Sequence, residues 1–166
     1  VARGEVLLAG GRVLREHDIA ALAAVGVMNV EVSARPRVGI ISTGDELVDV
    51  DAMPSLGQVR DMNSYALHAA ARLAGARPEI LGIVRDDYAS LAQAMRDALP
   101  RVDMLIVSGG SSIGVRDFAR EAIDSLGKPG VLVHGVAVKP GKPTIIAVAD
   151  GIPIFGLPGH PVSCLT

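Results

Sequence analysis

The chain has 166 residues, of which 49% are hydrophobic, 20% charged and 2% aromatic, and its formal net charge is −2. This composition fits one ordinary domain with an aliphatic core, and it excludes a disordered chain, while the charge argues against a nucleic-acid or anionic membrane surface. The single cysteine, Cys164, excludes an internal disulfide and a cysteine-based zinc cluster, and it agrees with a cytoplasmic location.

Residues 1–36 are predicted to form an appendage to the main domain, and Arg35-Pro36 is the expected linker. We expect a short strand at residues 6–8, and a helix that Asp18 caps and Gly26 closes. The segment has no signal-peptide pattern, and no apolar run in the chain is long enough to span a membrane. Because the chain lacks an initial Met and stops as an apolar helix begins, we expect a fragment whose last domain is truncated.

Strand and helix patterns alternate from residue 37 onward. Short apolar runs predict strands, and apolar residues at helical spacing predict helices, the second of them capped by Asp86 or Asp87. The predicted order is strand 38–41, helix 63–73, strand 79–84, helix 91–99, strand 104–107, a helix near 119–126, and strands 131–138, 144–148 and 152–157. No helix separates the last three strands, so we expect them to be antiparallel. Residues 37–166 are thus predicted to form a three-layer α/β sandwich with a mixed, mostly parallel sheet.

The loop 108–114, Ser-Gly-Gly-Ser-Ser-Ile-Gly, is the first candidate site. Ligands gather at the carboxyl ends of parallel strands, and this loop directly follows one. Gly109 and Gly110 allow backbone N–H groups to approach a ligand, Ser111 and Ser112 add hydroxyls, and a helix begins just after them. These features are typical of a phosphate cradle, although a plain strand-to-helix turn has the same composition.

The same loop also spells Gly-x-Ser-x-Gly around Ser112, the pattern of a hydrolase nucleophile. Asp124 or Asp150, followed by His160, would supply the acid and the histidine in the required order. A serine hydrolase is therefore an alternative interpretation.

Carboxylates and lysines supply two further candidate groups. Glu46, Asp86 and Asp117 each follow a strand end or the glycine loop, where together they would hold Mg²⁺ among phosphate oxygens. Helix capping explains Asp86 and Asp117 equally well. Lys139 and Lys142, two of only three lysines, lie in one proline-stiffened turn, and paired ammonium groups there favour an oxyanion ligand.

Six motifs, taken in order, resemble those of the molybdopterin molybdenumtransferases, a family that includes the C-terminal enzyme domain of gephyrin. They lie at residues 41–47, 61–64, 82–87, 108–118, 139–143 and 156–163. The resemblance implies an enzyme that takes adenylylated molybdopterin, hydrolyses off AMP with Mg²⁺, and places molybdate on the dithiolene. It also implies that residues 1–36 are a hinge segment belonging to a neighbouring domain of a longer parent protein. A homodimer and partner molybdenum-cofactor enzymes are implied as well.

The resemblance assigns roles to individual residues. Glu46, Asp86 and Asp117 match the acidic, metal-binding positions of the active centre, and Asp61 and Asn63 match a polar stretch near the pterin pocket. The remaining matches are the terminal-phosphate loop, Gly109, Gly110, Ser111 and Ser112, and the oxyanion-binding turn, Lys139 and Lys142.

Two positions depart from the family pattern. His160 stands where the family usually has Asn, and Ser111 stands where it has Val or a similar residue. Three other functions remain open: the adenylyltransferase of the preceding step, a binding or scaffold module without catalysis, and a nucleotide-amide hydrolase domain, which the basic turn disfavours.

Overall fold

The structure is a computed structural model that describes residues 2–109 and 118–166, and it consists of two compact units, Val1–Ala34 and Arg35–Thr166. The first unit contains one helix, α1 (Glu16–Ala24). Residues 6–8 form no strand, so the expectation of a strand there was wrong. Val6 is 78% exposed, and the half-buried Leu7 and Leu8 lie in a bend.

Asp18 caps α1 from inside the helix rather than from the position before it. The helix begins three residues earlier than predicted, and the Asp18 carboxylate accepts a hydrogen bond from the backbone N–H of Arg15 at 2.9 Å. This hydrogen bond lowers the pKa of Asp18, and the nearby Arg12 guanidinium acts in the same direction. The carboxylate thus satisfies a backbone donor that the first helical turn leaves open.

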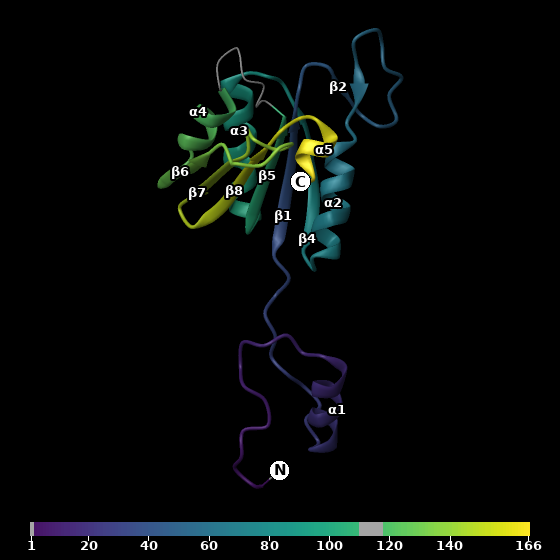
Figure 1. The fold of residues 1–166 in the computed structure, drawn as a ribbon, viewed down its shortest axis with the longest axis vertical. Helices are drawn as coiled ribbons and strands as arrows, with labels where there is room; N and C mark the ends of the chain where they lie inside the picture. Colours follow the sequence, from purple (N-terminus) through teal and green to yellow (C-terminus); the bar gives the residue numbers. More distant parts are fainter. Residues whose placement is uncertain (1, 110–117) are drawn as a thin grey trace. The chain divides into compact units, whose positions relative to one another are not determined.

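The second unit is built on a six-stranded mixed sheet (Figure 1). The strands, in spatial order, are β4 (Arg77–Val84), β1 (Arg37–Thr43), β5 (Met104–Gly109), β8 (Ile152–Leu157), β7 (Ile145–Ala149) and β6 (Pro129–His134). β1 pairs in parallel with β4 and β5, whereas β7 is antiparallel to both of its neighbours. The predicted fold class is confirmed.

The last three strands were expected to be antiparallel, and β6, β7 and β8 do pair in this way. The prediction did not include the pairing of β8 with β5. The turn at Asp150 and Gly151, both with positive φ, reverses the chain tightly between β7 and β8. This reversal makes β8 parallel to β5, so β8 joins the parallel part of the sheet. The expected strand 131–138 is shorter and begins earlier, as β6.

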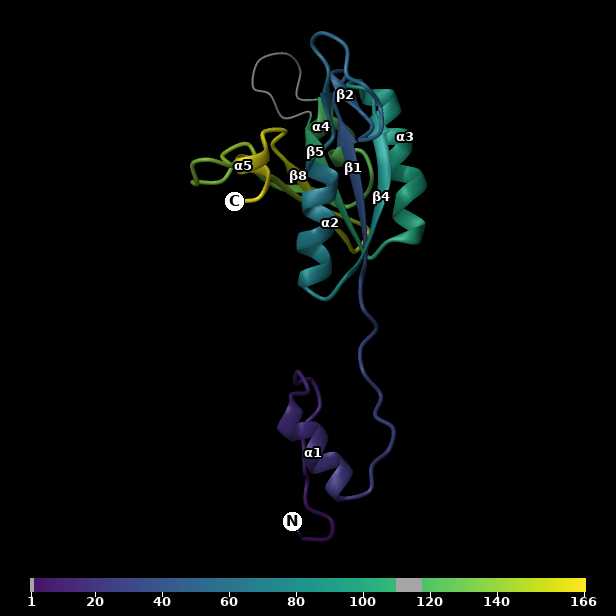
Figure 2. The ribbon, with the colours of Figure 1, turned by 90° about the vertical axis from the view of Figure 1, so that its right-hand side faces the viewer.

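Helices cover both faces of the sheet (Figure 2). α2 (Asn63–Leu73) lies on one face, where Leu67 packs with Val38 and Ile40 of β1. α3 (Tyr88–Ala98) and α4 (Phe118–Asp124) lie on the other face, in a cluster that includes Ile41. Ile40 and Ile41 serve opposite faces because successive strand residues alternate. The three layers of the prediction are therefore present.

The start of α3 resolves an alternative that the sequence left open. Asp87 is the capping residue, because its carboxylate accepts a hydrogen bond from the Ser90 backbone N–H at 2.9 Å, which lowers the pKa of Asp87. Asp86 is therefore free of the capping role. After Ala98 the chain continues as a short 3₁₀ turn, Leu99–Arg101, with Pro100 inside it.

A small parallel sheet, absent from the prediction, closes the long loop after β1. It pairs β2 (Leu47–Val48) with β3 (Val59–Arg60). The Val59 backbone N–H donates to the Glu46 carbonyl at 2.8 Å, and the Asp61 N–H donates to the Val48 carbonyl at 2.9 Å. The loop ends are thereby held together. Among the described residues, no helix has both the length and the apolar content needed to cross a bilayer.

Candidate functional site

A cavity of about 660 Å³ lies at the carboxyl ends of the parallel strands β1, β5 and β8. Thr43 and Gly109 line it from the ends of β1 and β5, and Pro158 lines it just after β8. Six residues singled out in the sequence contribute to its wall: Glu46, Asp61, Asn63, Asp86, Gly109 and His160. The topology thus brings together segments that are far apart in the chain.

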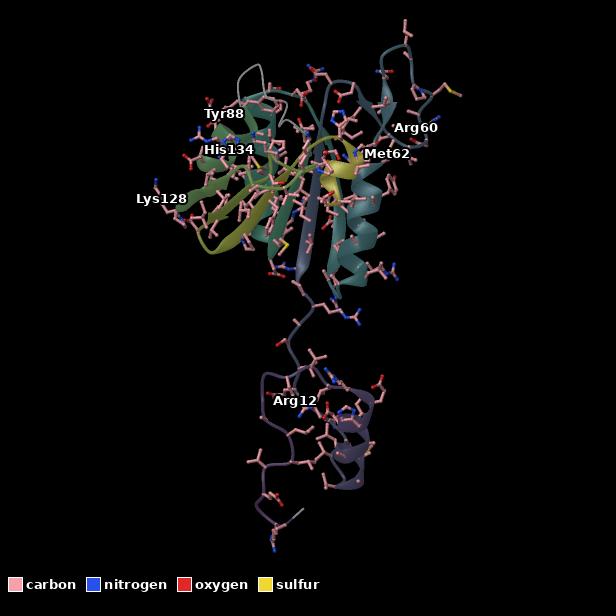
Figure 3. The ribbon with its side chains drawn as sticks, viewed as in Figure 1. Arg12, Arg60, Met62, Tyr88, Lys128 and His134 are labelled. Carbon is pink, nitrogen blue, oxygen red and sulfur yellow. The ribbon has the colours of Figure 1, made fainter. Side chains whose placement is uncertain are left out.

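Other lining residues were given no individual role from the sequence, although several lie within its six motifs. Arg60 and Met62 lie on either side of Asp61 and border the same cavity (Figure 3). Pro143, Pro161 and Ser163 also line the cavity. Arg60 could have been identified from the sequence, because it places a positive charge directly beside the polar stretch that begins at Asp61.

The carboxylates of Glu46 and Asp86 line the same cavity, and both residues are exposed. The Thr43 hydroxyl donates to Asp86 Oδ1 at 2.7 Å, so the end of β1 orients that carboxylate. The Asp86 backbone N–H lies 3.3 Å from Asp45 Oδ1. Within residues 2–109 and 118–166, no three His, Cys, Asp or Glu side chains lie close enough to hold a metal ion. Asp117 lies outside the described residues.

Gly109 closes the end of β5 against β1. Its φ is +105°, and a Cβ there would lie 2.0 Å from the Thr43 carbonyl oxygen. Only glycine fits this approach, so the first glycine of the predicted cradle has a reason within the sheet itself. The rest of that cradle, Gly110, Ser111 and Ser112, lies outside the described residues.

The lysine turn lies beside the cavity without forming its wall. Lys139 and Lys142 are exposed, and of this turn only Pro143 is a lining residue in the described part of the chain. Gly141 is buried, and a Cβ there would lie 3.5 Å from the Ser163 carbonyl oxygen. The turn is therefore packed against α5 (Pro161–Cys164), with its ammonium groups on a neighbouring surface.

A buried polar network supports the wall at the start of α2. Asp61 is 5% exposed, and its carboxylate accepts hydrogen bonds from the backbone N–H and the hydroxyl of Ser64. The Ser42 hydroxyl, at the end of β1, lies 2.8 Å from the Ser64 hydroxyl. Because these groups satisfy one another, they can remain buried and hold α2 against β1.

Asn63 links three segments around the cavity. Its side-chain amide donates to the Ser108 hydroxyl at 2.9 Å and to the Gly159 carbonyl at 2.7 Å. Ser108 in turn lies 3.6 Å from the thiol of Cys164 in α5. Burial raises the pKa of that thiol, and the negative charge of Asp61 adds to the effect. The neutral thiol is part of the core beneath the site.

The hydrolase interpretation is not supported. Asp124 accepts a hydrogen bond from the Val131 backbone N–H, and Asp150 accepts one from the Lys128 N–H, so both carboxylates hold the start of β6. Asp150 precedes β8 and His160 follows it, so the length of the strand separates them. Figure 3 labels Lys128, which directly precedes β6, and His134, the last residue of β6. β6 is the edge strand opposite β4.

Residues 39–166 match a protein family described as "Probable molybdopterin binding domain". Over 165 residues the chain is 40% identical to a molybdopterin molybdenumtransferase of Nostoc, covering 98% of this chain and 38% of the relative. It is 37% identical over 163 residues to a protein of the same name from Staphylococcus aureus, covering 98% and 39%. The chain therefore spans about two fifths of the length of these relatives.

Solved structures agree with the sequence relatives. A molybdopterin biosynthesis moeA protein from Pyrococcus horikoshii has a TM-score of 0.81 and 41% identity, covering 96% of this chain and 39% of its own. A molybdopterin biosynthesis enzyme MoaB from Thermus thermophilus has a TM-score of 0.59 at 23% identity, covering 78% and 84%. That second likeness concerns the fold alone.

Proposed function

The chain belongs to the molybdopterin-binding domain family, and from this membership we propose that it supplies the pterin-phosphate- and molybdate-binding domain of a molybdopterin molybdenumtransferase. In the proposed reaction, the full-length protein inserts molybdate into adenylylated molybdopterin and releases AMP. The observation that carries the proposal is the cavity at the carboxyl ends of β1, β5 and β8, with Glu46, Asp86 and Gly109 on its wall.

Glu46 and Asp86 are proposed to act in catalysis with Asp117, and to hold Mg²⁺. The donor set fits this ion, because Mg²⁺ in proteins is commonly held by one or two carboxylates together with substrate phosphate oxygens. Thr43 supports the role by fixing one oxygen of Asp86 at 2.7 Å. When bound, Mg²⁺ would neutralise charge on the phosphates.

Two further groups are proposed to bind the anionic parts of the substrates. Gly109, Gly110, Ser111 and Ser112 would receive the terminal phosphate of the pterin through backbone N–H groups and hydroxyls. Lys139 and Lys142 would attract molybdate to the neighbouring surface, because Pro143 of the same turn borders the cavity. Asp61 and Asn63 would then contact the pterin itself.

The setting of the reaction is likewise proposed. Residues 1–36 would belong to the hinge of a neighbouring domain, and a homodimer of the full-length protein would complete the site. The protein would act in the cytoplasm, where it would deliver the finished cofactor to molybdenum-dependent enzymes.

Release of AMP from adenylylated molybdopterin by the full-length protein tests the proposal. We expect release that depends on both molybdate and Mg²⁺. Consumption of ATP to make the adenylylated pterin would instead assign the preceding step, and binding without turnover would assign a scaffold.

The Asp117→Asn variant tests the third carboxylate. We expect the variant to lose most of its activity and to keep the melting temperature of the parent. A large fall in melting temperature would show that the Asp117 carboxylate caps the helix and has no role in the reaction.

A further inference from the structure

The wall of the cavity carries more negative than positive side chains. Glu46, Asp61 and Asp86 line it, and Arg60 is the only residue with a permanent positive charge among the described lining residues. The proposed ligands carry phosphate and molybdate groups, which are anions themselves, so three nearby carboxylates would repel them. Part of this repulsion is offset when Mg²⁺ is bound. Arg60 is the described side chain that can offset the rest from the cavity wall.

The two lysines to which the family resemblance assigns an oxyanion do not share this position. Lys139 and Lys142 are exposed and are absent from the described lining of the cavity, to which their turn contributes only Pro143. Exposed charges can attract an anion toward the protein over a distance, because they add to the field around it. Direct contact inside the cavity requires a cation on its wall, and Arg60 meets this requirement.

The Arg60 side chain is held at one point and has no charged partner in the described structure. Its Nε–H donates to the Ala52 carbonyl oxygen at 3.1 Å, inside the loop between β2 and β3. This is its only side-chain hydrogen bond within residues 2–109 and 118–166, and it forms no ion pair there. The terminal nitrogens of a guanidinium carry four more N–H donors, which suit a bidentate contact with two oxygens of a phosphate or a similar anion.

The backbone at Arg60 is fixed by the small parallel sheet. Arg60 is the last residue of β3 (Figure 3) and the register partner of Val48 in β2. The residues before and after it each donate a backbone hydrogen bond to the segment that contains β2, at 2.8 and 2.9 Å. The first of these bonds ends on the Glu46 carbonyl, so position 60 is tied to a proposed metal-binding residue. A side chain on a fixed backbone loses less conformational freedom when it binds a ligand.

We propose that Arg60 binds a tetrahedral oxyanion in the cavity, either a phosphate group of the substrate or molybdate. The inference rests on the proposed function, and it adds a binding residue that neither the family resemblance nor the lysine turn supplies. A guanidinium holds such an anion through two parallel hydrogen bonds, whereas an ammonium group provides only a point charge. Arg60 and a metal ion held by Glu46 and Asp86 would then both offset the negative charge of the ligand.

The first test measures ligand binding by the full-length protein and by its Arg60→Met variant. The probes are AMP, sodium molybdate and the uncharged adenosine, each titrated by calorimetry. We expect the variant to bind AMP or molybdate about 10- to 100-fold more weakly and adenosine equally well, because only an anion loses a charge-assisted hydrogen bond. A loss for AMP alone assigns a phosphate group, a loss for molybdate alone assigns molybdate, and a loss for both assigns a shared position. Unchanged affinities for both anions, or no binding of either anion to the parent, would overturn the inference.

Arg72→Met is the matched control for the lost charge. Arg72 is exposed in the last turn of α2, is not among the described lining residues, and forms no ion pair in the described part of the chain. This variant should change neither anion affinity by more than about twofold, because salt screens exposed charges that do not contact the ligand. Equal losses in both variants would mean that net charge governs binding, which contradicts a contact at Arg60.

Arg60→Lys separates ligand binding from support of the loop. Lysine keeps the positive charge but lacks the Nε–H that bonds to Ala52. We expect this variant to recover part of the anion affinity that Arg60→Met loses. No recovery would assign Arg60 to holding the loop, against the inference.

The binding measurements also distinguish this inference from the proposed reaction. A protein that binds the anion through Arg60 but releases no AMP would keep the inference and lose the proposed reaction. Release of AMP by Arg60→Met with the kcat/KM of the parent would keep the reaction and lose the inference.

Discussion

The carboxylates near the two ends of strand β1 differ in how many hydrogen bonds they accept. At the amino end, the Asp103 carboxylate accepts three hydrogen bonds from Arg37, one from its backbone N–H at 2.8 Å and two from its guanidinium at 3.2 and 2.9 Å. The guanidinium lowers the pKa of Asp103 to about 2. At the carboxyl end, Asp86 accepts one hydrogen bond from Thr43, and Glu46 accepts none from a described side chain.

This difference separates structural charges from candidate functional ones. Arg37 and Asp103 are each other's hydrogen-bond partners, and they hold the start of β1 beside β5. Within residues 2–109 and 118–166, Asp86 accepts a side-chain hydrogen bond only from Thr43 and Glu46 accepts none, and both residues line a cavity where a cation or a substrate can reach them. Charged groups with spare hydrogen-bonding capacity in a cavity are therefore the ones to test first.

The largest expected effect comes from Asp86→Asn at the carboxyl end. We expect AMP release by the full-length protein to fall about 1,000-fold, because the amide cannot supply the negative charge that the metal needs. The neighbouring Asp87→Asn is the matched control: Asn also caps helices well, so α3 should persist and activity should change little. Equal losses in both variants would contradict the assignment of Asp86.

The second-largest effect is expected on the stability of the protein, at the carboxyl ends of β1 and β5. Gly109→Ala should lower the free energy of unfolding by about 3 kcal/mol or more, because the new Cβ meets the Thr43 carbonyl and φ is positive. Gly82→Ala in β4 has a similar φ of +110° and no atom within 4 Å of the added Cβ, so it should cost only about 1 kcal/mol. Urea unfolding measures the loss of stability in both variants. Equal losses would show that the positive φ, and not the contact with Thr43, determines the effect at Gly109.

The smallest expected effect lies at the amino end. Because folding lowers the pKa of Asp103 to about 2, its stabilising contribution is fully present above its ordinary pKa of about 3.9. The contribution is lost as the pH falls through about 2. Asp103→Asn should therefore be slightly less stable than the parent at pH 7, and the gap should close near pH 2. Urea titrations at several pH values measure the gap, and a constant gap would exclude this ion pair as its source.

The sequence alone predicted the layers of the second unit because its periodic patterns are local. Apolar runs marked β1, β4 and β5, and the helical spacing from Leu91 to Leu99 marked the buried face of α3. Polar residues at the strand ends predicted where a site would lie, and Glu46, Asp86 and Gly109 border the cavity. The same local information placed a strand at residues 6–8, where the described chain forms none.

Tertiary structure decided which polar groups are used and which are free. The sequence could not choose between Asp86 and Asp87 as the cap of α3, because both have the same chemistry and nearly the same position. The choice depends on Thr43, which lies about forty residues away and holds Asp86. The parallel pairing of β8 with β5, and the Asn63 bond to Gly159, likewise depend on contacts between distant segments that only the folded chain creates.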